Sequence, residues 1–152
     1  MHTVDQSSLV SAYGDFFGAW PWDHYATLTF ARKLSDSTCL RHWDEFIDSL
    51  GRVTHGRVAW VRANDSRWSG YASPEIPLHY HALIKYRNVP AAGDVAGLWK
   101  ARAGDAKVEI YDAGCGAAYY IAKMFPYGDA RYDMGGLEHF GRSKDPDRRL
   151  VQ

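Results

Sequence analysis

The sequence has little cysteine, no long apolar run and no net charge. Its two cysteines, Cys39 and Cys115, stand far apart without a CxxC partner, which argues against a disulfide framework and against a thiolate zinc site. The 18 basic residues are balanced by 18 acidic ones, so any affinity for nucleic acid must come from local patches. No apolar stretch approaches the ~20 residues needed to cross a bilayer, and the N-terminus lacks the features of a signal peptide. We therefore expect a soluble, cytoplasmic protein.

The apolar material that is present suits one domain. The residues are 46% hydrophobic and 14% aromatic, which is enough apolar material for one core. A chain of 152 residues is too short for two ordinary domains. We expect an N-terminal extension over residues 1–18, one domain over residues 19–140 and a polar C-terminal tail over residues 141–152. A single functional site is the simplest assumption for a domain of this size.

Turn-rich stretches divide the domain into segments with recognisable periodicities. The patterns predict strands over residues 24–30, 57–63, 76–86 and 106–111, and helices from Ser35 to Gly51, within residues 90–102 and over residues 114–125. The order is βαββαβα with an antiparallel sheet. This order is typical of an α+β fold of the ferredoxin-like or RNA-recognition-like kind, with helices on one side of the sheet.

The third predicted strand carries a His-x-His pattern. Because side chains alternate along a strand, His79 and His81 point to one face, about 7 Å apart, while Tyr80 points to the other. Two imidazoles at this spacing can converge on one metal ion. Taken alone, the pattern more often marks a structural or surface role.

The last predicted helix contains a tyrosine and a lysine three residues apart. Tyr120 and Lys123 therefore lie on one flank of that helix. A phenol with a pKa of about 10 is a poor nucleophile at neutral pH, so phosphoryl chemistry at a tyrosine requires a nearby cation. An ordinary amphipathic helix gives the same pattern.

In combination, and in this order, three segments resemble the HUH endonuclease superfamily, in particular its single-tyrosine replication-initiator branch. YATLTF at residues 25–30 is similar to the first-strand signature, LHYHALI at residues 78–84 to the histidine motif, and YIAK at residues 120–123 to the Tyr-x-x-Lys helix. The resemblance covers residues 22–140.

The resemblance implies a site and a reaction. His79 and His81 would bind a divalent ion, Mg²⁺ or Mn²⁺, that stabilises charge on the phosphate. Tyr120 would attack the phosphodiester, giving a 5′-phosphotyrosine link and a free 3′-hydroxyl. Lys123 would orient the tyrosine or offset negative charge beside it.

The sequence departs from the pattern of that superfamily at two positions. Its members commonly have a third metal ligand, often Glu, at the end of the strand before the histidine pair. This chain has Arg62 near that place, so Asn64 and Asp65 are the candidates for the third ligand. Met124 stands where two-tyrosine members have their second tyrosine, so we expect a one-tyrosine enzyme.

Aromatic and basic residues follow one another near the histidine pair. The candidates for contact with single-stranded DNA are Arg62, Arg67, Trp68, Lys85 and Arg87. Core packing and solvated strand edges explain the same residues equally well. The expected partner is single-stranded DNA at an origin or element end, with no membrane. A separate helicase is expected for unwinding, since the chain has no GxxxxGK[ST] motif.

Two other interpretations stay open beside the leading one, a nickase and strand transferase that initiates rolling-circle replication. A minimal single-tyrosine transposase would share the histidine pair, but such proteins usually follow the tyrosine with a glutamine, which YIAK lacks. A non-catalytic module of the RNA-recognition kind would use YATLTF as a core strand and bind nucleic acid without cleaving it.

Overall fold

The computed structural model describes residues 6–64, 79–122 and 132–140. Its elements are α1 (Gln6–Gly18), β1 (His24–Thr29), α2 (Asp36–Thr54), β2 (Val58–Asn64), β3 (His79–Tyr86), α3 (Ala92–Lys100), β4 (Ala106–Ile110), the 3-10 turn η1 (Ala113–Cys115), α4 (Ala117–Ala122), β5 (Tyr132–Gly135) and the 3-10 turn η2 (Leu137–His139). The predicted order βαββαβα is present from β1 to α4. The structure adds α1 before it and β5 and η2 after it.

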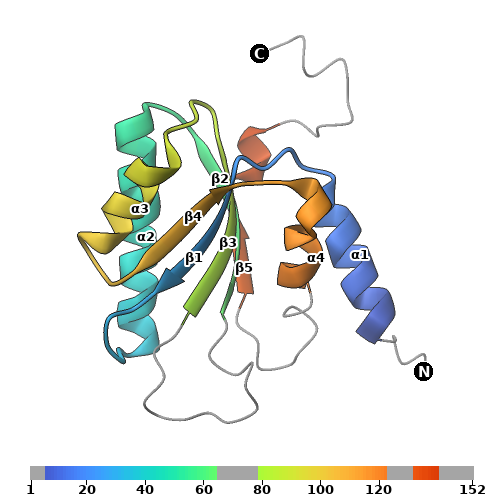
Figure 1. Cartoon of the computed structure of the whole chain (residues 1–152), viewed down its shortest axis with the longest axis horizontal. Coiled ribbons are helices and arrows are strands. Elements are labelled where there is room, and N and C mark those ends of the chain that lie inside the picture. The colour runs from blue at the N-terminus through green and yellow to red at the C-terminus, as the bar shows by residue number, and fades with distance from the viewer. Residues whose placement is uncertain (1–5, 65–78, 123–131, 141–152) are drawn as a thin grey trace.

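The five strands form one antiparallel sheet in the order β4-β1-β3-β2-β5 (Figure 1). The predicted α+β class with an antiparallel sheet is confirmed. β3 lies at the centre of the sheet, where His81 has Thr27 of β1 on one side and Ala63 of β2 on the other. The strand that carries the His-x-His pattern is therefore flanked by a strand on each side.

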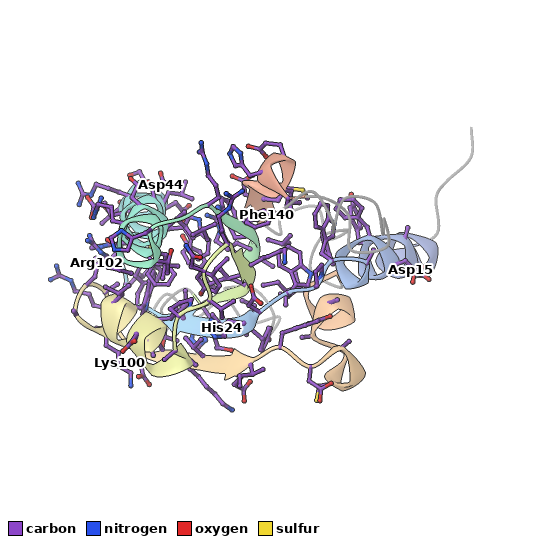
Figure 2. All side chains as sticks on the ribbon, turned by 90° about the horizontal axis from the view of Figure 1, so that it is seen from above. Asp15, His24, Asp44, Lys100, Arg102 and Phe140 are labelled. Carbon is purple, nitrogen blue, oxygen red and sulfur yellow. The ribbon has the colours of Figure 1, made fainter. Side chains whose placement is uncertain are left out.

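Helices cover both faces of this sheet. The view from above shows α2 and α3 on one side and α1 and α4 on the other (Figure 2). The expectation of helices on one side only was therefore wrong. The physical reason is the composition of β3, which is buried continuously from Tyr80 to Ile84, because a strand that is apolar on both faces needs a cover on each. We call the side covered by α2 and α3 the α2 face.

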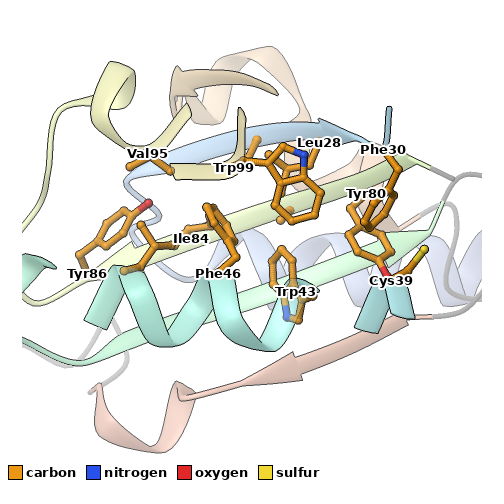
Figure 3. Packing of buried hydrophobic residues seen from close by; sticks show 13 residues of the cluster. Leu28, Phe30, Cys39, Trp43, Phe46, Tyr80, Ile84, Tyr86, Val95 and Trp99 are labelled. Carbon is orange, nitrogen blue, oxygen red and sulfur yellow. The ribbon is translucent and has the colours of Figure 1, made fainter. Parts of the chain in front are cut away.

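Aromatic rings fill the core on the α2 face. Ser35 caps α2, accepting a hydrogen bond from the Thr38 backbone N–H at 3.3 Å. The segment was predicted to present its apolar residues at helical spacing, namely Cys39, Leu40, Trp43, Phe46, Ile47 and Leu50. Four of them, Cys39, Trp43, Phe46 and Leu50, are buried in one core with Val95 and Trp99 of α3 (Figure 3). Ile47 is partly buried, whereas Leu40 is exposed. Each large side chain buried in this way stabilises the fold by roughly 1.5–3 kcal/mol. This layer packs against the face of β3 opposite the histidine pair.

Gly51 does not end α2, contrary to the prediction. The helix continues to Thr54 and stops at His55, which adopts a left-handed conformation with a φ of 53°. Thr54 is buried and its hydroxyl donates to the Leu50 carbonyl at 2.6 Å, so the last turn remains packed against the domain. The free energy that a glycine costs inside a helix is smaller than the free energy that would be lost if this last turn did not pack.

A second, smaller core lies on the other side of the sheet. It contains Phe17, Trp20, Trp22, Val61, Ala63, Leu83, Ala118, Ile121 and Ala122. Trp22, just before β1, forms a hydrogen bond with α1, since its indole N–H donates to the Phe17 carbonyl at 2.6 Å. α1 is therefore packed into the domain, although residues 1–18 were predicted to be an extension.

The predicted helix over residues 114–125 is broken near its start. Gly116 has a φ of 73°, which separates η1 from α4, and residues 123–125 lie outside the described part of the chain. The predicted polar tail also lies outside it. Within residues 6–64, 79–122 and 132–140, no helix is long and apolar enough to cross a bilayer.

Candidate active site

The two histidines lie on the sheet face opposite α2. Tyr80, the residue between them, belongs to the core of the α2 face, and Leu83, two residues beyond His81, belongs to the second core. We call the side that carries His79, His81 and Leu83 the histidine face. His79 at the start of β3 is half-buried, and His81 retains 6% of its exposure. Tyr80 is fully buried on the α2 face, and this burial raises the pKa of its phenol, so its hydroxyl does not reach the histidine face.

A tyrosine from the neighbouring strand contacts one of these histidines. The Tyr25 hydroxyl lies 3.2 Å from Nδ1 of His81. The two rings are nearly parallel, with an interplanar angle of 13° and a centroid separation of 6.2 Å. Tyr25 opens the YATLTF segment, for which the sequence offered no individual role.

The helix that contains Tyr120 packs on the same face as the histidines. Its residues Ala118, Ile121 and Ala122 are buried in the second core together with Leu83 of β3. α4 also contacts β3 directly and lies beside α1 (Figures 1 and 2). The backbone at Tyr120 is thus held on the histidine face. Lys123 follows α4 in the sequence and lies outside the described residues.

The histidine pair offers a partial ligand set for a divalent ion. Two neutral imidazoles two residues apart on one strand face can bind one cation, and Mg²⁺ or Mn²⁺ would complete its shell with oxygen ligands. With Nδ1 of His81 engaged by the Tyr25 hydroxyl, coordination by this ring falls to Nε2. No group of three or more His, Cys, Asp or Glu side chains gathers within the part of the chain that the structure describes.

The predicted third ligand is not supplied by Asn64. Asn64 pairs with Tyr80 across β2 and β3, which places it on the α2 face, away from the histidines. The β2 residues on the histidine face, Ala59, Val61 and Ala63, are apolar. This placement corrects the assignment of Asn64 as a metal ligand. Asp65, the other candidate, lies outside the described residues and stays a prediction.

Arg62 is buried in the core of the α2 face, which corrects its assignment as a DNA contact. It retains 3% of its exposure, and its guanidinium carbon lies 5.2, 5.4 and 5.0 Å from the ring centroids of Trp43, Trp60 and Tyr80. Burial lowers the pKa of Arg62, while the phenol of Tyr80 and the carboxylate of Asp133, its partner on β5, oppose the shift. Three ring faces replace part of the lost hydration.

The buried position of Arg62 leads to a stability prediction. We expect Arg62→Ala to lower the free energy of unfolding by about 3 kcal/mol in urea denaturation, because it leaves a cavity between three rings. Arg62→Met should lose much less, since its chain fills the same space without a buried charge. Affinity for single-stranded DNA should be unchanged in Arg62→Met. If Arg62→Met kept native stability but lost its affinity for single-stranded DNA, the result would support the predicted contact between Arg62 and a phosphate.

The other predicted DNA contacts do not gather around the histidines. Lys85 is on the histidine face, but four residues and roughly 13 Å along the strand from His81. Its ammonium donates to the Pro21 carbonyl at 3.3 Å and lies 5.4 Å from the Phe140 ring centroid. Arg87 is exposed just beyond the same end of β3. Arg67 and Trp68 lie outside the described residues.

A basic residue that the sequence did not single out is level with His81. Thr27 is opposite both His81 on β3 and Lys107 on β4, so the three residues form one row across the histidine face. Lys107 is exposed and forms an ion pair of 3.3 Å with Glu109 on its own strand, which is a weak interaction in water. The alternation of AKVEI gives the face of Lys107 only once the strand order is known.

The arrangement joins a metal-binding type of residue pair, a tyrosine-bearing helix and an exposed cation on one sheet face. Each comes from a different element, β3, α4 and β4, and each is held by its own backbone pairing or packing. Imidazoles are common ligands of metal ions, and an exposed lysine can contact a phosphate. Comparisons with models of known protein families, with curated proteins and with solved structures found no match for this chain, so its function has to be inferred from this geometry.

Proposed function

We propose that this chain is a metal-dependent endonuclease of the HUH type that nicks single-stranded DNA and transfers the cut strand. The observation that carries the proposal is the packing of α4 on the histidine face, with Ile121 and Ala122 buried beside Leu83 of the histidine strand. Tyr120 and the pair His79 and His81 belong to different motifs, on α4 and β3, and α4 packs against the face of the sheet that carries the two histidines.

The reaction divides into roles for this chain's own residues. His79 and His81 would hold Mg²⁺ or Mn²⁺, which when bound withdraws charge from the phosphate. The Tyr120 oxygen attacks phosphorus and gives its proton to water, a P–O bond to that oxygen forms, and the bond to the 3′-oxygen breaks. The departing 3′-oxygen takes a proton from water to become a hydroxyl, so the proton count balances. The 5′-phosphotyrosine link keeps the ester, so a later 3′-hydroxyl can reverse the step and rejoin a strand.

The function in the cell follows from this chemistry. Nicking that leaves a 3′-hydroxyl and stores the 5′ end suits the initiation of rolling-circle replication, with a separate helicase for unwinding. A single-tyrosine transposase would perform the same chemistry on element ends. Candidate element ends in a strand-transfer assay separate the two, because only a transposase joins them to new targets.

The open-sheet binding module is disfavoured by the covered faces. RNA-recognition modules stack bases on aromatic side chains of an exposed sheet face. Here Tyr86 is buried against His24, with its hydroxyl 3.1 Å from Nδ1 of that ring, and Trp60 packs on Trp43. These aromatics serve the core.

The direct test is a search for a covalent intermediate. The full chain is incubated with a random single-stranded DNA pool and Mn²⁺, and the protein is analysed by intact mass spectrometry. We expect an adduct of protein and DNA that forms with Mn²⁺ and is absent with EDTA. A DNA pool that is bound but never cleaved or attached would contradict the proposal and favour a binding module.

The row of Lys107, Thr27 and His81 gives a binding prediction. Lys107→Ala should weaken binding of single-stranded DNA about 3- to 10-fold at low salt and reduce the slope of log affinity against log salt by about 0.7, since one phosphate contact is lost. Fluorescence anisotropy at several salt concentrations measures both. The control is Arg52→Ala, which removes another exposed cation, at the end of α2. Equal losses in the two variants would mean that the histidine face is not the DNA site.

A further inference from the structure

The contact between Tyr25 and His81 suggests a role for the hydroxyl. We propose that Tyr25 is a positioning residue that fixes the tautomer and the ring orientation of His81 for metal binding. The inference rests on the proposed function, because it concerns how one of the two histidines binds the cation. It assigns a task to a residue that has neither a ligand nor a nucleophile role in the reaction above.

The geometry holds the His81 ring in two ways. Tyr25 is paired with Leu83, and Thr27 with His81, so Tyr25 is the diagonal neighbour of His81 on the same face, a placement that aromatic side chains can span. The hydroxyl contact of 3.2 Å restrains one edge of the imidazole. The nearly parallel rings restrain rotation about the bond that joins the imidazole to its Cβ.

The hydroxyl contacts Nδ1 and can accept a hydrogen bond from it, which is the direction that metal binding at Nε2 requires. A neutral imidazole carries its proton on one nitrogen and its lone pair on the other. When Nδ1–H donates to the Tyr25 oxygen, the lone pair is at Nε2, which is the form that coordinates a metal. Partners of this kind on a metal-binding histidine typically contribute 10- to 100-fold to metal affinity. Burial of His81 strengthens the contact, because little water competes for it.

The test uses Tyr25→Phe, which keeps the ring and removes only the hydroxyl. Mn²⁺ affinity is measured by isothermal titration calorimetry, and the His81 tautomer is read from its imidazole ¹⁵N shifts in the metal-free protein. We expect about 10-fold weaker Mn²⁺ binding and a shift of His81 away from the Nδ1–H tautomer. Tyr111→Phe is the matched control, because Tyr111 is a partly buried tyrosine that packs against the same second core.

The outcomes separate the inference from the proposed function. Unchanged Mn²⁺ affinity and an unchanged His81 tautomer in Tyr25→Phe would overturn the positioning role while wild-type metal binding stands. Equal effects in Tyr111→Phe would also overturn it, since they would show a general loosening of the second core. If the wild-type chain binds no Mn²⁺, the proposed function fails, and the positioning role fails with it.

Discussion

Tyr120→Phe should abolish the covalent adduct and lower nicking by about 10⁴-fold or more, because phenylalanine has no oxygen that can form the phosphate ester. The substitution removes one hydroxyl from a residue of α4, whose packing depends on its neighbours Ala118, Ile121 and Ala122. We therefore expect the far-ultraviolet circular dichroism and the melting temperature to stay close to those of the wild type. The adduct is measured by intact mass spectrometry and nicking by gel assay.

Two other tyrosines serve as controls for this assignment. Tyr119→Phe makes the same change one position earlier on α4 and should leave most of the adduct. Tyr25→Phe should lower the amount of adduct through weaker metal binding, and excess Mn²⁺ should restore it, whereas loss of a nucleophile cannot be restored in this way. Peptide mapping of the wild-type adduct identifies the modified residue directly. DNA found on Tyr25 or Tyr119 would show that the nucleophile has been assigned to the wrong residue.

Local patterns in the sequence were sufficient to predict most of the elements. The alternation in HYHALIKY predicted a strand with Tyr80 turned away from the histidines, and Tyr80 is packed in the core of the α2 face. The helical spacing of apolar residues predicted the buried side of α2 for Cys39, Trp43, Phe46 and Leu50, but it also included Leu40, which is exposed. Such patterns depend only on residues close in the chain, where backbone geometry fixes which side chains share a face.

The errors arose where residues distant in sequence decide the outcome. Arginine is usually a surface residue, and only the packing of α2 against β2 and β3 encloses Arg62 between Trp43 and Tyr80. The contact of Tyr25 with His81 depends on the register between β1 and β3, which the sequence does not show. The cover on the histidine face was missed because α1 has a weak periodic pattern and was assigned to an extension.

His79→Ala should lower nicking by about 10²- to 10³-fold, since a cation that loses one of its two imidazoles can no longer be held at the phosphate. His79 is half-buried at the first position of β3, so its removal should cost little stability. His139→Ala, at an exposed histidine of η2, is the matched control and should retain wild-type activity.

Metal binding can be separated from catalysis by its effect on stability. A cation that binds only the folded chain raises the melting temperature with its concentration, by a free energy of about 2.7 kcal/mol at 100 times its dissociation constant. We expect this rise with Mn²⁺ for the wild type and for His139→Ala, and its loss in His79→Ala. Nicking that persists in EDTA would overturn the metal requirement, and a rise in melting temperature that persists in His79→Ala would place the cation elsewhere on the molecule. In that case the packing of α4 against the histidine face of β3 would serve the core alone and would not form an active site.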